Sequence, residues 1–109
     1  MAYIKPSKPF NQELEKVLAY AMFEFGVTTV KRFNQAYQRI RNRLAIHPCS
    51  SPKEPLLKSF LRPYRSAIIM KNWKIIYRYD AEYDRIILVD LWDMRRNPKY
   101  LTRQFRRKL

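Results

Sequence analysis

The chain has 109 residues, of which 47% are hydrophobic, and it carries a net charge of +14. This length fits one compact domain spanning residues 1–109, and the hydrophobic content argues against disorder. A single cysteine excludes an internal disulfide and is too little for a cysteine-based metal site. No apolar run approaches the ~20 residues of a membrane span and no secretory signal is evident, so we expect a cytoplasmic protein without a metal or small-molecule cofactor.

The N-terminal part of the sequence predicts a short strand and a helix. Residues 3–5 could form an edge strand, since the proline that follows is tolerated at a sheet edge. Residues 11–25 place apolar side chains along one helical stripe. Asn11 fits the N-cap of this helix, and Gly26, the only glycine, fits its C-cap. The stripe consists of Leu14, Val17, Leu18, Ala21, Met22 and Phe25.

A second helix is predicted to begin at Thr28 or Thr29 and to end near Ile46. The connection between the two helices is only two or three residues long, which predicts an antiparallel helical hairpin. Both helices are amphipathic, so both need an apolar partner, and a sheet is the obvious candidate. The stripe of the second helix is Val30, Phe33, Tyr37, Ile40 and Leu44.

Residues 47–63 predict irregular structure, because four prolines exclude a long helix. Three runs rich in β-branched and aromatic residues follow, separated by short polar turns, which predicts an antiparallel meander. On the last run Ile87, Val89 and Leu91 form a wholly apolar face, which we assign to the side covered by the helices. The three runs are residues 64–69, 73–79 and 85–92.

The C-terminal tail predicts a short basic helix. Leu101, Phe105 and Leu109 recur at a spacing of four, and Arg95 to Leu109 contains seven basic residues and no acidic one. The predicted fold class is therefore α+β: an N-terminal helical hairpin packed on a small twisted antiparallel sheet, with a short basic C-terminal tail or helix.

The net charge favours polyanionic partners, since 23 lysines and arginines stand against 9 acidic residues. Three kinds of partner fit: nucleic acid, a nucleoprotein such as the ribosome, or an acidic protein that masks the surface. A membrane surface fits less well, because no segment combines a basic face with a broad apolar face.

This order of elements resembles the RelE/ParE superfamily of bacterial toxins. The residues that carry the likeness are Tyr-Arg-Ser at 64–66, Asn-Trp-Lys-Ile-Ile-Tyr-Arg at 72–78, and the strand from Ile87 that ends in Asp-Met-Arg-Arg-Asn-Pro at 93–98. The superfamily has a comparable central strand, which reads tyrosine, basic residue, two aliphatic residues, tyrosine. Its final strand ends in a small or polar residue followed by Arg-Arg or a near variant.

The resemblance implies a toxin of a type II toxin–antitoxin pair whose partner is a cognate antitoxin, and it implies one of two targets. RelE-like members cut mRNA on the ribosome without metal, whereas ParE-like members inhibit DNA gyrase and lack nuclease residues. The leading hypothesis is a RelE-like ribosome-dependent mRNA endonuclease. A ParE-like gyrase inhibitor remains an alternative, as does a basic nucleic-acid-binding module that uses Trp73, Tyr77 and Tyr79 as stacking groups.

The resemblance also assigns roles to basic residues of the strands and tail. The central-strand arginine of the nucleases corresponds to Lys74, their final-strand arginine to Arg95, and their tail tyrosine falls near Tyr100. A lysine of these nucleases is replaced here by Ala67, which leaves the group that would accept the 2′-hydroxyl proton unidentified. The predicted catalytic residues are thus Lys74, Arg95 and Tyr100, and the predicted nucleic-acid-binding residues are Arg65, Arg78, Arg96, Lys99 and Arg103.

The same residues also allow structural roles. Arg95 and Arg96 could pair with the neighbouring acids Asp90 and Asp93, and Tyr100 could simply pack the tail onto the sheet.

Overall fold

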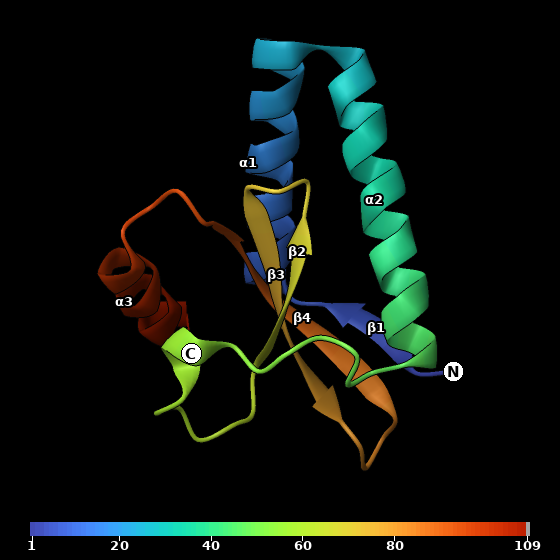
Figure 1. The fold of residues 1–109 in the computed structure, drawn as a ribbon, viewed down its shortest axis with the longest axis vertical. Helices are drawn as coiled ribbons and strands as arrows, with labels where there is room; N and C mark the ends of the chain where they lie inside the picture. Colours follow the sequence, from blue (N-terminus) through green and yellow to red (C-terminus); the bar gives the residue numbers. More distant parts are fainter. Residues whose placement is uncertain (109) are drawn as a thin grey trace.

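The computed structural model describes residues 1–108 and confirms the α+β class (Figure 1). Two long helices form the predicted hairpin, a sheet follows, and a third helix ends the chain. None of the helices in this part of the chain is long and apolar enough to cross a membrane. The elements in chain order are β1 (Tyr3–Pro6), α1 (Lys8–Phe25), α2 (Val27–Ile46), the 3₁₀ turn η1 (Pro55–Leu57), β2 (Arg65–Ile69), β3 (Trp73–Asp80), β4 (Arg85–Asp93) and α3 (Pro98–Lys108).

Both helices of the hairpin begin earlier than predicted. The N-cap of α1 is Ser7 and not Asn11, because the Ser7 side chain accepts a hydrogen bond from the Phe10 N–H at 3.2 Å. Pro9 lies in the first turn, where a missing N–H costs nothing. Gly26 is the predicted C-cap, with φ at +86°, and its N–H donates to the carbonyls of Ala21 and Met22. α2 follows directly at Val27, so the hairpin connection is a single residue.

The sheet contains the predicted meander and one further strand. Its order is β1-β4-β3-β2, with β2, β3 and β4 antiparallel and β1 parallel to β4. The predicted edge strand is thereby confirmed, but it makes the sheet mixed instead of purely antiparallel. A parallel neighbour is possible because α1, α2 and two further strands lie between β1 and β4 in the sequence.

A β-bulge in β4 corrects the predicted faces of that strand. Ile76 pairs with Asp90 and Tyr77 pairs with Leu88, so Val89 is an extra residue without a partner. Before the bulge the even-numbered residues face the helices, and after it Leu91 does. The assignment of Ile87 and Val89 to the helix side was therefore wrong, because strict alternation does not hold through a bulge.

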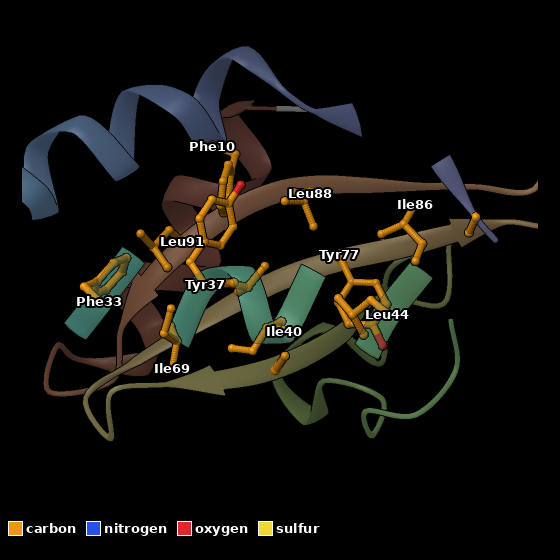
Figure 2. Close-up of a cluster of buried hydrophobic side chains, with 13 residues drawn as sticks. Phe10, Phe33, Tyr37, Ile40, Leu44, Ile69, Tyr77, Ile86, Leu88 and Leu91 are labelled. Atoms are coloured by element: carbon orange, nitrogen blue, oxygen red, sulfur yellow. The ribbon is translucent and has the colours of Figure 1, made fainter. Parts of the chain in front are cut away.

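The main hydrophobic core lies between the helical hairpin and one face of the sheet (Figure 2). The predicted stripe of α2 supplies much of it, and all of its members except Val30 are buried. From the sheet, Ile75 and Tyr77 of β3 lie in this core, and the Tyr77 hydroxyl donates to the Pro48 carbonyl at 2.9 Å. Burial raises the pKa of Tyr77. Because Tyr77 is fully buried, it cannot stack on a nucleic-acid base.

A second, smaller core occupies the opposite face of the sheet. The predicted terminal helix is confirmed as α3, and this core joins Trp92 of β4 and Tyr64 to its Leu101 and Phe105. Leu109, the third member of the predicted stripe, lies outside the described residues. The sheet is therefore covered on both faces, by the hairpin on one and by α3 with η1 on the other.

The tip of the helical hairpin extends past the end of the sheet (Figure 1). The predicted stripe of α1 is consequently buried only in part: Ala21 is buried, whereas Met22 and Phe25 are exposed. Phe23 is 87% exposed and Val27 is also exposed, so the tip presents a cluster of apolar side chains to solvent.

Candidate functional site

The centre of the candidate site is an ion pair between Lys74 and Glu54. Lys74 lies on β3, on the face opposite the helical hairpin, and Glu54 comes from the loop before η1. The Glu54 side chain is 1% exposed and the Lys74 side chain 15% exposed. The Lys74 ammonium also lies 5.4 Å from the centre of the Trp92 ring, a distance typical of a cation–π contact.

The loop 47–63 brings Glu54 to this position for local reasons. Glu54 is the N-cap of η1, where its Oε2 accepts the Leu56 N–H at 3.3 Å, and Pro55 follows in the first turn. The Glu54 N–H also donates to the Tyr64 carbonyl at 2.9 Å, which ties the loop to the sheet. Sequence reasoning missed Glu54, although one signal was available, since it is the only acid in residues 47–63.

A cavity of about 380 Å³ lies beside the pair. Lys74 and Glu54 both line it, together with Arg43, whose guanidinium donates to the Ser51 hydroxyl at 2.8 Å. Two cations and one carboxylate at a cavity can bind an anionic group and hold a base next to it. Ala67, the position where the resemblance leads one to expect a lysine, is buried and also lines this cavity.

Arg95 lies at the end of β4, away from Lys74. Its guanidinium forms two bonds of 2.9 Å with the Asp93 carboxylate and lies 5.4 Å from the centre of the Trp73 ring. Arg95 therefore pairs with Asp93, as the structural alternative predicted. These bonds hold the pKa of Asp93 below its ordinary value. Trp73 belongs to the helix-side core, whereas Trp92 beside Lys74 belongs to the opposite core. Arg95 lines a pocket between α1 and α3 that Lys74 does not line.

The remaining predicted site residues lie in three places. Tyr100, on α3, accepts a hydrogen bond from Gln104 at 2.8 Å, and the Arg96 guanidinium lies 4.4 Å from the centre of its ring. Arg65 donates to the Ser51 carbonyl at 2.7 Å, close to the Lys74 cavity. Arg78 lies further along β3, where burial and the charge of Arg62 lower its pKa. Lys99 and Arg103 line a groove on the outer side of α3.

The geometry thus brings Lys74 and Arg65 to one region of the sheet and leaves Arg95 apart from it. Tyr100 belongs to α3, which packs on the same face as Lys74. In the described part of the chain no group of three or more histidine, cysteine or acidic side chains is arranged to hold a metal ion.

Asp90 is a buried carboxylate that anchors the end of α3. It accepts hydrogen bonds of 2.9 Å from the Trp92 indole, from the Leu91 N–H and from the Lys108 ammonium. Lys108 also lies 3.5 Å from Glu13 of α1. Burial nevertheless raises the pKa of Asp90, because desolvation outweighs these favourable contacts.

The raised pKa predicts a pH-dependent contribution to stability. A carboxyl whose folded pKa lies above the unfolded value of about 3.9 contributes stability that is fully present below that value and is lost as pH rises through the folded pKa. Asparagine does not ionise, so Asp90→Asn does not lose stability in this way. Its free energy of unfolding relative to that of wild type should therefore increase as pH rises above about 4. Urea unfolding of both proteins across this pH range measures the difference. A difference that shrinks with rising pH would mean that the pairing with Lys108 outweighs burial.

The family model described as ParE toxin of type II toxin–antitoxin system, parDE, matches residues 4–98. The crystal structure of a metal-bound toxin from Helicobacter pylori has a similar fold, with a TM-score of 0.59 at 21% sequence identity, over 85% of this chain and 94% of that chain. No curated protein matches the sequence.

Proposed function

Although the chain belongs to the ParE toxin family of type II toxin–antitoxin systems, we propose that it arrests growth by cutting mRNA on the ribosome and that a cognate antitoxin holds it inactive in the cytoplasm. The observation that carries this proposal is the Lys74–Glu54 pair at the edge of a cavity. It supplies a carboxylate where the sequence left the proton acceptor unidentified.

The proposed reaction is metal-free cleavage through the ribose 2′-hydroxyl. The Glu54 side chain, which is 1% exposed, must first turn toward the cavity. The 2′-oxygen then attacks the adjacent phosphorus, its proton passes to the Glu54 carboxylate, and the bond to the 5′-oxygen breaks. The 5′-oxygen takes up a proton, so the products are a 2′,3′-cyclic phosphate and a 5′-hydroxyl. Lys74, whose charge lies next to Glu54, stabilises the negative charge that builds up on the phosphate oxygens.

Three further cations and a tyrosine complete the proposal. Arg43 and Arg65 lie beside the cavity through their bonds to Ser51, where they can hold the flanking phosphates. Arg95 lies apart from the cavity and would hold a more distant phosphate, whereas the Tyr100 hydroxyl would be the donor to the leaving oxygen. In that role Arg95 must exchange its bonds to Asp93 for bonds to phosphate.

The test compares wild type with Glu54→Gln in a ribosome-dependent cleavage assay. Glutamine keeps the shape and an acceptor for the Leu56 N–H but cannot take up the proton, so the rate should fall by about a hundredfold or more. Glu82→Gln, a change of the same kind in an exposed turn, is the matched control and should cut at the wild-type rate. Equal rates for wild type and Glu54→Gln would exclude Glu54 as the base.

A second candidate function is inhibition of DNA gyrase through protein contacts. Membership of the ParE toxin family favours it, as does the apolar hairpin tip, since exposed aromatic clusters commonly mark protein-binding sites. A gyrase supercoiling assay separates the two candidates. Inhibition by wild type that is lost in Phe23→Ser/Phe25→Ser and kept in Glu54→Gln would favour the second function and overturn the first.

A further inference from the structure

The outer side of α3 carries four closely spaced positive charges. Lys99, Arg103, Arg106 and Arg107, which we call the α3 basic face, recur at helical spacings and so lie on one side of the helix. All four line a groove of about 500 Å³ together with Leu56 and Pro98. The inner side of the same helix is anchored through Leu101 and Phe105, so the orientation of the basic face is fixed by packing.

The charges of this face have no acidic partner of their own. None of the ion pairs among residues 1–108 includes any of the four cations. Arg106 lies 5.6 Å from the centre of the Phe60 ring, which positions its guanidinium without neutralising it. Four like charges within 9 residues repel one another, and a bound polyanion would remove that cost.

The character of the groove favours a nucleic-acid backbone over an acidic protein segment. Protein partners are usually held by aromatic or aliphatic anchors in apolar pockets, whereas Leu56 and Pro98 are the only apolar residues that line this groove. A phosphate backbone is held mainly by cations and hydrogen-bond donors, and needs no apolar pocket. Three of the four cations are arginines, whose planar guanidinium matches phosphate geometry.

The groove lies next to the candidate site, on the other side of η1. Glu54 and Pro55 line the Lys74 cavity, and Leu56, the next residue, lines the groove. The two depressions therefore lie on either side of η1. A single strand that enters the cavity can therefore continue across η1 onto α3.

We propose that the α3 basic face is a sequence-independent binding surface for the backbone of single-stranded RNA, which delivers the strand to the Lys74 cavity. This inference deepens the proposed function, but RNA can bind to the surface whether or not the chain cuts it. The contacts are to phosphates, so the surface adds affinity without selecting a base sequence.

The experiment uses the full chain and a fluorescent single-stranded RNA of mixed sequence in which every ribose is 2′-O-methylated. Such RNA has no 2′-hydroxyl nucleophile, so binding is measured without cleavage and the result does not depend on the proposed reaction. Arg103→Gln/Arg107→Gln is compared with Lys31→Gln/Arg32→Gln, which removes the same charge from exposed positions on α2. Binding is followed by fluorescence anisotropy over a range of salt concentrations.

Loss of two phosphate contacts should lower the magnitude of the slope of log affinity against log salt by about 1.4. It should also weaken binding at low salt by about tenfold or more, with the same loss for RNA of different sequences. The α2 control should change the slope far less.

Equal slopes and affinities for the α3 and α2 variants would overturn the proposal. So would an α3 variant that loses affinity for polyglutamate and keeps its affinity for RNA, because the surface would then be one for an acidic protein.

Discussion

Replacing Lys74 by methionine is expected to lower the free energy of unfolding by about 3 kcal/mol. The change leaves the Glu54 carboxylate buried without its cation, since Glu54 is almost inaccessible to solvent. Its other hydrogen bond, from the Leu56 N–H, supplies only part of the lost stabilisation. We take the lower end of the range for a broken buried pair, because Lys74 itself keeps some contact with water. Urea unfolding followed by tryptophan fluorescence measures the change.

The double variant Glu54→Gln/Lys74→Met tests the cause. A neutral glutamine does not need the cation, so the double variant should recover most of the stability that Lys74→Met loses. Lys31→Met, at an exposed position on α2, is the control and should stay within about 0.5 kcal/mol of wild type. If the double variant is as unstable as Lys74→Met, the loss comes from the packing of the lysine stem on Trp92 and not from the ion pair.

The single and double variants together also show whether a loss of toxicity comes from unfolding or from lost chemistry. A loss of toxicity in Lys74→Met alone has two explanations, because an unfolded toxin is inactive whatever its mechanism. A double variant that is folded and still fails to cut RNA assigns the loss to chemistry. A folded double variant that arrests growth as wild type does would instead point to the apolar tip of the hairpin.

The sequence was informative where periodicity decides the structure. The stripe of α2 and the alternation on β3 predicted the two elements that meet in the main core, and Gly26 marked the boundary between the helices. It was less informative at β4, because a bulge at Val89 reverses the alternation without any change in composition. It also could not predict the exposure of Phe25, since a helical stripe does not reveal where the sheet beneath it ends.

The candidate site was predicted only in part, for a related reason. The resemblance identified Lys74, but the partner of Lys74 lies 20 residues away in an irregular loop, where no period places a side chain. Likewise, Arg95 follows β4, the neighbour of the strand that carries Lys74, yet the two side chains lie against different tryptophans. Tertiary packing, not strand order, separates the predicted catalytic residues.

Replacing Phe105 by alanine is expected to have the largest effect on the fold, about 4 kcal/mol of unfolding free energy. Phe105 is buried in the second core, where its ring meets those of Phe60, Tyr64 and Trp92 edge to face at 5.4, 5.0 and 5.9 Å. Alanine removes the whole ring, so both the cavity that it leaves and the lost aromatic contacts contribute.

The same change should release α3 from the sheet. At 11 residues the helix is too short to be stable alone, so it depends on the packing of Leu101 and Phe105. Hydrogen exchange of the α3 amides should therefore accelerate in Phe105→Ala, and the tryptophan fluorescence should shift as Trp92 becomes exposed. Arg107→Ala, at an exposed position on the same helix, should leave both measurements unchanged.

Loss of the helix should also remove the function, because both proposed roles of the tail depend on its position. Tyr100 and the α3 basic face move with the helix, so Phe105→Ala should lose RNA binding and toxicity, as should a chain truncated before Lys99. If Phe105→Ala unfolds within about 1 kcal/mol of wild type and still arrests growth, then α3 does not depend on this anchor. The target would in that case meet the hairpin tip or the sheet, and not the tail.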